Sequence, residues 1–364
     1  MKYIDEFRNK NLIRMAADKI REIMPEEEIN IMEVCGTHTQ SFFRFALDQL
    51  LPENLRLISG PGCPVCVSPQ AYIDRAIELS RDRDNIILSF GDMLRVPGGR
   101  STLEKERAKG SAIRVVYSAL DSLLIARKNS HKRVIFLAVG FETTAPTIGA
   151  ALLLAKKENL KNLLFFSSLK LIPPAMEYLV QDGRLRLSGF LCPGHVSVII
   201  GTKPYGIIAE KYGIGCCIAG FEPLDILEGI YFLIKQIVIK RPRVDNQYMR
   251  VVTKQGNLRA QKIIRGVFKS ADSAWRGLGG IPRSGLKIKD EFSRFDAEKV
   301  LGISYQLSAI SYQQTKCKCG EVLKGLISPL ECPLFMKACR PENPLGPCMV
   351  SNEGACNAHY RYKK

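Results

Sequence analysis

Residues 133–146 read RVIFLAVGFETTAP, and this stretch predicts the fold class. The apolar run from Arg133 to Val139 has the length and composition of a buried strand, and it ends at Gly140. A polar turn follows, and Pro146 stands where a helix would begin, since proline fits the first turn of a helix. A strand, a short turn and a helix in direct succession form the repeating unit of α/β proteins.

The same unit recurs between about residues 28 and 239. Short apolar runs end in glycine, cysteine or another turn signal and precede predicted helices; they lie at 29–34, 55–59, 85–90, 163–167 and 215–219. This alternation predicts parallel sheets. Ligands of such sheets bind beyond the carboxyl ends of the strands, which is where nearly every unusual residue of this chain falls.

The length of 364 residues suggests two or three domains. A Gly-Phe-Glu tripeptide follows a predicted strand twice, at 140–142 and 220–222, which suggests a distant internal repeat. We therefore predict two similar α/β lobes, residues 1–125 and 126–244. Residues 245–364 are predicted to form a helical segment followed by a cysteine-rich, loop-rich domain.

The composition argues against some classes of function. The chain has 53 lysines and arginines against 36 aspartates and glutamates, for a net charge of +17. The basic residues are scattered and no nucleic-acid motif accompanies them, so we expect no nucleic-acid binding. No apolar stretch approaches the length of a membrane span. Residues 1–24 resemble an amphipathic helix and not a signal peptide, so we expect a cytoplasmic protein, in which cysteines favour metal binding or catalysis over disulfides.

Six of the twelve cysteines lie in the last part of the chain, here called the tail (residues 317–364). They are Cys317, Cys319, Cys332, Cys339, Cys348 and Cys356. Interleaved prolines keep this segment out of long helices. Thiolates at such density hold soft metals or exchange electrons, and four-thiolate iron–sulfur sites use loops of this kind.

The segment Cys35-Gly36-Thr37-His38-Thr39 places a thiol and an imidazole three residues apart at the end of a predicted strand. Both groups bind metals, and thiolate suits iron in particular. The start of the following helix favours a thiolate by only about 0.3–1 kcal/mol, which lowers a thiol pKa by less than about one. A metal or a stronger cationic neighbour must supply the rest if Cys35 acts as a thiolate. The alternative is a buried cysteine beside a capping threonine.

Residues 60–66 read GPGCPVC, in which Cys63 and Cys66 have the spacing of a redox dithiol. The flanking glycines let the backbone approach a ligand closely. Half of a zinc site is the alternative, which is weakened because the sequence has no second Cys-x-x-Cys.

Cys192 and His195 form another closely spaced thiol and imidazole at a predicted strand end. A nucleophilic Cys–His pair and a purely structural turn both explain this spacing. Cys216 and Cys217 lie inside an apolar run, and we expect them to be core thiols.

Glu142 and Thr143 offer a carboxylate and a hydroxyl at a predicted helix start. They would bind a small anion, a nucleotide or a partner's side chain there, although capping alone explains the neighbouring Thr144. Asp92 follows another strand and would add a polar group to the same cleft.

The chain closely resembles the HypD family of [NiFe]-hydrogenase maturation factors from about residue 27 to its C-terminus. The resemblance rests on five motifs in order: Cys-Gly-Thr-His-Thr, Gly-Pro-Gly-Cys-Pro-Val-Cys, Gly-Phe-Glu-Thr-Thr-Ala-Pro-Thr, Cys-Pro-Gly-His-Val-Ser and Cys-Met-Val-Ser-Asn-Glu-Gly-Ala-Cys. It implies two similar α/β domains and a [4Fe–4S] domain similar to that of ferredoxin–thioredoxin reductase.

The resemblance also implies a role for each motif. Cys35 would hold the iron of an Fe(CN)2CO group during its assembly, together with a HypC-type chaperone, and His38 would assist. Cys63 and Cys66 would form a thiol redox couple. Cyanide would arrive from a HypE-type partner, as a thiocyanate on that partner's own cysteine. We expect a monomer or a transient heteromeric complex.

The tail would carry the [4Fe–4S] cluster, which needs four of the six thiols. We predict Cys317, Cys332, Cys339 and Cys356 as ligands, with Cys319 and Cys348 as a second thiol pair. The choices between Cys317 and Cys319, and between Cys348 and Cys356, stay open at this point.

These roles predict a metallochaperone with redox and ligand-transfer activity. Electrons would pass from the tail to the dithiol, which would cleave thiocyanate reductively or keep iron reduced. Glu142, Thr143, Asp92 and His195, at neighbouring strand ends, would hydrogen-bond cyanide nitrogens or move protons. Two other classes stay open: a stand-alone iron–sulfur oxidoreductase and a zinc-stabilised scaffold protein.

Overall fold

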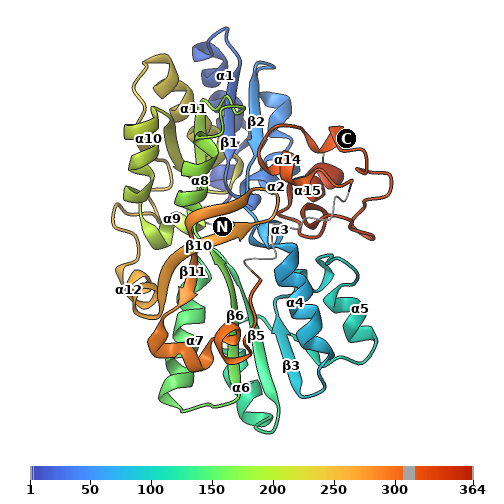
Figure 1. Ribbon diagram of the computed structural model, residues 1–364. Coiled ribbons are helices and arrows are strands. Elements are labelled where there is room, and N and C mark those ends of the chain that lie inside the picture. Colours follow the sequence, from blue (N-terminus) through green and yellow to red (C-terminus); the bar gives the residue numbers. More distant parts are fainter. Residues whose placement is uncertain (1, 3, 306–315, 363–364) are drawn as a thin grey trace.

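The computed structural model describes residues 2, 4–305 and 316–362. These residues form two β-sheets, which lie one above the other in Figure 1, and a tail that packs at their junction. The tail contacts both halves, since Glu353 is hydrogen-bonded to Thr37 and the Val350 carbonyl to Arg95. The predicted α/β class, with parallel-dominated sheets and a cysteine-rich C-terminal region, is confirmed.

The upper sheet of Figure 1 has five strands in the order β2-β1-β7-β8-β9. Every neighbouring pair in this sheet is parallel. The strands are β1 (Ile29–Glu33), β2 (Leu55–Ser59), β7 (Gly189–Pro193), β8 (Gly215–Ala219) and β9 (Val244–Asn246).

The lower sheet has six strands in the order β10-β11-β6-β5-β3-β4. Four of them are parallel to one another, and an antiparallel hairpin of β10 and β11 extends the sheet beyond β6. The strands are β3 (Asn85–Ser89), β4 (Ile113–Val115), β5 (Arg133–Gly140), β6 (Leu163–Lys170), β10 (Phe268–Trp275) and β11 (Gly279–Ile288).

The chain passes repeatedly between the two sheets. It forms β1 and β2 in the upper sheet, β3 to β6 in the lower, β7 to β9 in the upper, and β10 and β11 in the lower. The predicted boundaries near residues 125 and 244 therefore do not separate the sheets, because each sheet takes strands from both sides of residue 125. Strands that are close in sequence share local pattern, but packing between distant segments decides which sheet each joins.

Helices cover both faces of each sheet. They are α1 (Lys10–Ile23), α2 (Gly36–Arg44), α3 (Pro64–Val67), α4 (Gln70–Arg81), α5 (Leu103–Ala108), α6 (Asp121–Lys128), α7 (Ala145–Lys157), α8 (Ile172–Val180), α9 (Gly194–Ile200), α10 (Gly206–Tyr212), α11 (Pro223–Val238), α12 (Leu258–Val267), α13 (Ala297–Val300), α14 (Cys319–Leu323) and α15 (Ala355–Tyr362). None of the helices in the described ranges is long and apolar enough to cross a membrane.

Alternate side chains along each strand enter two different cores. In the upper sheet, Leu191 and Cys217 pack with α11, whereas Phe190 and Cys216 pack on the opposite face with α8 and α10. A strand buried on both faces needs an almost continuous apolar run, and for this reason the strands could be predicted from the sequence. Cys216 and Cys217 are fully buried in these cores, as predicted.

Candidate functional site

Four chain segments meet at the carboxyl edge of the upper sheet. Cys35 follows β1, Cys63 follows β2, His195 follows β7 and Phe221 follows β8. The four strands are parallel neighbours, so the segments that follow them lie side by side. The structure thus brings together three motifs that the sequence separates by up to 160 residues, and it adds Phe221 to them.

Cys35 is the N-cap residue of α2, and its thiol is buried. The backbone N–H groups of Thr37 and His38 and the Thr37 hydroxyl face the sulfur and favour the thiolate. Burial opposes them, and together with the Glu353 carboxylate it raises the pKa of Cys35 to about 12. The thiol is therefore protonated at neutral pH, and a metal ion that binds it must displace the proton.

Glu353 joins the tail to the start of α2. The Thr37 hydroxyl donates a 2.8 Å hydrogen bond to its carboxylate, and a Cβ atom on Gly36 would lie 2.3 Å from its carbonyl oxygen. Only glycine at position 36 allows this approach. Burial raises the pKa of Glu353, and so does the carboxylate of Asp92, which comes from the lower sheet. Glu353 lies within the Cys-Met-Val-Ser-Asn-Glu-Gly-Ala-Cys motif, of which only the cysteines were predicted to have a role.

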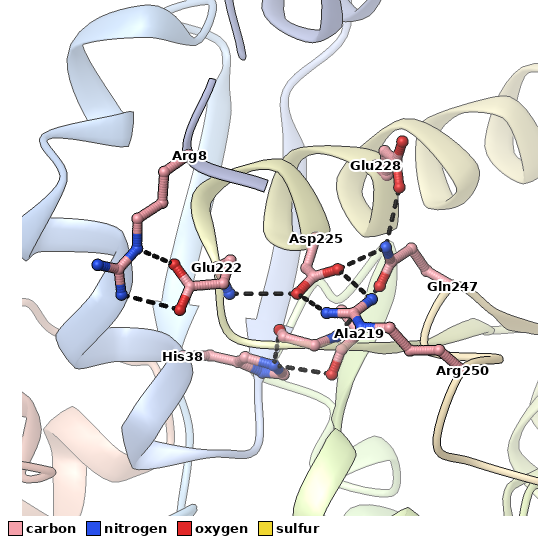
Figure 2. Close-up of polar contacts among 9 residues, drawn as sticks. Arg8, His38, Ala219, Glu222, Asp225, Glu228, Gln247 and Arg250 are labelled. Atoms are coloured by element: carbon pink, nitrogen blue, oxygen red, sulfur yellow. Dashed lines mark hydrogen bonds and ion pairs between the residues drawn. The ribbon is translucent and has the colours of Figure 1, made fainter. Parts of the chain in front are cut away.

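Phe221 contacts two histidine rings, with its centroid 5.0 Å from that of His38 and 4.0 Å from that of His195. His38 is fully buried, and its Nε2 lies 3.2 Å from the Ala219 carbonyl oxygen and 2.9 Å from that of Gly220 (Figure 2). Carbonyl oxygens only accept, so Nε2 carries the proton. Burial lowers the pKa of His38 to about 4. The ring is therefore neutral, and Nδ1 is a lone pair with no hydrogen-bond partner among the described residues.

The dithiol loop lies directly against Cys35. The Gly36 N–H donates to the Gly62 carbonyl oxygen at 3.2 Å, and a Cβ atom on Gly62 would lie 2.2 Å from the Cys35 nitrogen. Cys63 is the N-cap residue of α3, and its sulfur accepts from the Cys66 N–H at 3.4 Å. Both thiols are buried, and burial raises the pKa of Cys66. Cys35 and the dithiol therefore form one packed unit.

The tail thiols continue from the dithiol. The Cys348 side chain interacts with those of Cys66, Cys319 and Cys356, and these interactions contribute to the shift of its pKa. The sulfur of Cys319 lies 3.1 Å from that of Cys317. An unbroken row of thiols therefore leads from the dithiol into the tail.

The remaining tail residues complete a donor set of the kind that iron–sulfur clusters use. Gly346 leaves room beside Cys317 and Cys319, since its Cβ would lie 2.5 and 2.6 Å from their sulfurs. The sulfur of Cys339 accepts a backbone N–H at 3.4 Å, and Cys332 is buried in the same core cluster. These cysteines fit a cluster in donor type, since all of them carry thiols. Across the described ranges, however, no three metal-binding side chains are already spaced as a finished metal site.

Glu142 and Thr143 follow β5 of the lower sheet, and the first is buried whereas the second is exposed. Glu142 is buried, and its Oε1 accepts a 2.9 Å hydrogen bond from the Ile172 N–H, while Oε2 has no partner among the described residues. Burial raises the pKa of Glu142 to about 7. Thr143 is exposed. Within the described part of the chain, no hydrogen bond joins either residue to Cys35.

Cys192 and His195 do not form a nucleophilic pair. The Cys192 thiol is fully buried, donates weakly to the Phe190 carbonyl and neighbours Cys216. His195 is exposed and stacks on Phe221. The geometry therefore supports a purely structural role for Cys192. His195, like His38, contacts the Phe221 ring.

A cleft of about 1300 Å³ lies between α4, the β10–β11 hairpin and the tail. Cys317 lines this cleft, and it is only partly buried, whereas the other eleven cysteines are buried. The row of thiols thus approaches solvent at Cys317, far along the row from Cys35.

The fold and the site define a class of α/β protein with two mainly parallel sheets and a cysteine-rich tail. Between them lies a row of thiols that ends beside a buried cysteine and histidine. The family model HypD, described as "Hydrogenase formation hypA family", matches residues 11–363. The hydrogenase maturation factor HypD2 of Bradyrhizobium diazoefficiens is 44% identical over 372 residues, which cover all of this chain and 97% of the relative. The HypD proteins of Cupriavidus necator and Escherichia coli K12 are 43% and 41% identical, over all of this chain and 97% and 99% of their own lengths.

The chain therefore belongs to the HypD family of hydrogenase maturation factors. The family predicted from the motifs is confirmed along the whole length of the chain.

Proposed function

We propose that this chain is the platform on which the Fe(CN)2CO group of a [NiFe]-hydrogenase is assembled. The iron is the cargo, and the Cys35 thiolate holds it together with a HypC-type chaperone. A HypE-type partner delivers cyanide as a thiocyanate. The observation that carries this proposal is the direct packing of Cys35 against the dithiol loop, which itself contacts the tail thiols.

The protonated state of Cys35 sets a condition on loading. Since burial keeps the thiol neutral, iron must bind as the proton leaves, and a nearby base makes that exchange easier. The carboxylates of Glu353 and Asp92 are close enough to influence each other, and that of Glu353 also influences Cys35. His38, His195, Glu142 and Thr143 are then available to hydrogen-bond the ligands or move protons, with His38 the only one of these within one helical turn of Cys35.

The dithiol supplies the electrons for cyanide release. Oxidation of Cys63 and Cys66 to a disulfide breaks two S–H bonds, forms one S–S bond and releases two electrons and two protons. The partner's thiocyanate takes up both electrons as its S–C bond breaks. Its sulfur leaves as a thiol with one proton, and cyanide takes the other. Thiol–disulfide chemistry of this kind needs the close approach that the Cys-x-x-Cys spacing provides.

The tail restores the dithiol. Cys317, Cys332, Cys339 and Cys356 would hold a [4Fe–4S] cluster, which supplies electrons one at a time when bound. Cys319 and Cys348 would then stand between the cluster ligands and Cys66. The interactions of Cys348 with both Cys66 and Cys319 support this division of the six thiols.

Infrared spectroscopy of the anaerobically purified complex with the HypC-type partner tests the iron site. Wild-type protein should show bands of iron-bound CO and cyanide, and Cys35→Ala should lose them. Cys217→Ala is a matched control, because Cys217 is also a buried cysteine and lies in the core of the same sheet. Bands of undiminished intensity in Cys35→Ala would refute the assignment of the iron to Cys35.

The redox row has its own test. Cys63→Ser and Cys66→Ser should each abolish hydrogenase maturation in cells while leaving iron and sulfide in the purified protein. Cys339→Ser should instead lower the iron and acid-labile sulfide content. Undiminished maturation by the dithiol variants, or wild-type protein with bound zinc and no sulfide, would contradict the redox role.

A further inference from the structure

A second group of buried polar side chains lies behind His38 and takes no part in the steps above. Asp225 is fully buried in the first turn of α11, and Arg250 donates to its two oxygens at 2.8 and 2.6 Å. The Gln247 amide donates to Asp225 at 2.7 Å and to Glu228 at 2.8 Å. Figure 2 shows these side chains grouped at the start of α11, with the Ala219 backbone between them and His38.

One peptide group connects this set to His38. The Gly220 N–H donates to Gln247 Oε1 at 3.1 Å, and the carbonyl of the same peptide group, that of Ala219, accepts from His38 Nε2. The N–H and C=O of a trans peptide point in opposite directions, so this group bridges the two side chains. The hydrogen bonds therefore run in one direction, from His38 through the peptide and Gln247 to the carboxylate of Asp225.

Asp225 also fixes the backbone that carries these carbonyls. The Glu222 N–H donates to Asp225 Oδ2 at 3.3 Å. A Cβ atom on Gly220 would lie 2.3 Å from the same oxygen and 2.8 Å from the Tyr248 ring, so only glycine fits at position 220. The segment that His38 contacts is thus held in place on both sides of Phe221.

We propose that Gln247 and Asp225 are positioning residues for His38, which hold it as the Nε2-protonated tautomer and present Nδ1 as an acceptor to the ligand bound at Cys35. Hydrogen bonds that run in one direction polarise one another, and a carboxylate at the end of the chain strengthens the effect. A partner on one ring nitrogen determines what the other nitrogen can do. Nδ1 can then accept a hydrogen bond or bind a metal ion, but it cannot donate.

The buried state of Nδ1 supports this assignment. The opposite tautomer would give up both bonds to the Ala219 and Gly220 carbonyls and would place an N–H at Nδ1, where the described residues offer no acceptor. If Asp225 and its partners served only to cap the start of α11, Gln247 would not be needed. Its amide oxygen accepts from the Gly220 N–H and not from a backbone group of the helix.

The inference rests on the proposed function only for the identity of the ligand, and nuclear magnetic resonance of the reduced, metal-free protein tests it separately. The chain has only four histidines, so labelling with [15N]histidine gives few signals, and His38→Gln identifies those of His38. Long-range proton–nitrogen correlation distinguishes a protonated ring nitrogen from an unprotonated one. Wild-type His38 should be a single Nε2-protonated tautomer at neutral pH, and a protonated Nδ1 would overturn the proposal at once.

Two variants examine the positioning residues. Gln247→Leu should produce signals of the second tautomer or exchange between the two. Asp225→Asn keeps the shape of the side chain, so it should keep the tautomer but move both His38 nitrogen resonances as the polarisation weakens. The matched control is Gln236→Leu, since Gln236 is a buried glutamine of α11 whose amide donates to the Cys216 carbonyl and to Asp245.

The control should leave the His38 signals unchanged. His38 signals that match wild type in both Gln247→Leu and Asp225→Asn, or that move as far in the control, would overturn the positioning role. If Gln247→Leu does not fold, the nitrogen shifts of Asp225→Asn decide the question. Failure here would leave the infrared result for Cys35→Ala unaffected, so the two proposals can fail separately.

Discussion

Replacing Arg250 with methionine would leave the buried carboxylate of Asp225 without its counter-ion. Arg250 makes both of its donor contacts to Asp225 within 2.8 Å, and the Asp225 side chain has no exposed surface. The amide of Gln247 and one backbone N–H would be the partners left to the carboxylate. Methionine keeps most of the apolar stem, so the change isolates the lost charge from lost packing.

The size of the effect follows from the burial of the pair. Removing one partner of a buried ion pair costs about 3–5 kcal/mol, because an uncompensated charge stays behind. The Arg250 side chain is 20% exposed, so water can reach part of the vacated space, and we expect the low end, about 3 kcal/mol. The lost stacking of the guanidinium on Phe7 and Tyr248, at 4.0 and 4.4 Å, adds about 0.5–1 kcal/mol.

Urea unfolding of the reduced protein, followed by circular dichroism, measures the loss. With an m-value near 3 kcal/mol/M, the midpoint should fall by about 1 M at unchanged slope. Arg243→Met is the control, because Arg243 pairs with Asp245 at 2.7 Å but is 42% exposed, and such pairs are worth less than about 1 kcal/mol. Equal midpoint shifts for the two variants would refute the argument that burial sets the cost.

Three shorter predictions follow from other parts of the structure. Hydrogen bonds from Arg81, a serine hydroxyl and a lysine lower the pKa of Glu106 to about 2, so its contribution to folding stability is present above its ordinary pKa and is lost as pH falls toward about 2. In urea unfolding, Glu106→Gln should therefore destabilise the protein at pH 7 and much less at pH 3. Equal losses of stability at the two pH values would contradict this. Gly62→Ala should lower the free energy of unfolding by about 1–3 kcal/mol, because its Cβ would lie 2.2 Å from the Cys35 nitrogen. Gly266→Ala in α12 is the control: its Cβ would meet nothing within 4 Å, so it should be neutral or stabilising in the same assay. Because only the thiolate reacts and the pKa of Cys35 is about 12, the alkylation rate of Cys35 should rise about tenfold per pH unit from pH 7 to 10. Mass spectrometry measures this rate. A rate that levels off below pH 9 would refute a protonated thiol at neutral pH.

The local units of the fold were predictable because their signals are local. The predicted strand at Arg133–Val139 corresponds to β5, which runs to Gly140, and Pro146 lies in the first turn of α7 as expected. Sheet membership was not predictable in the same way. Strand β1 pairs with β7, more than 150 residues later, because the two bury complementary faces, and no pattern in either segment records that partner.

In the candidate site, too, features set by the local sequence could be predicted and features set by long-range packing could not. Cys35 and Cys63 could be expected at one sheet edge, because each follows a strand and parallel strands share an edge. Glu353 and Gln247 could not be expected there. Each reaches the site through a long-range contact, to Thr37 in one case and to the Gly220 N–H in the other, and nothing in either local stretch of sequence indicates that contact.

The two copies of the Gly-Phe-Glu tripeptide have the same backbone role but different side-chain contacts. In the first copy, Phe141 packs on Trp275 in the core, and Glu142 is buried with one oxygen unpaired among the described residues. In the second copy, Phe221 contacts two histidine rings, and Glu222 accepts from Arg8 at the surface. The backbone role is shared, since both tripeptides end a parallel strand and precede a helix with proline in its first turn. The side-chain roles differ because the first copy meets the hairpin and the second meets α2, so the repeat correctly predicts where polar groups gather and cannot predict what they contact.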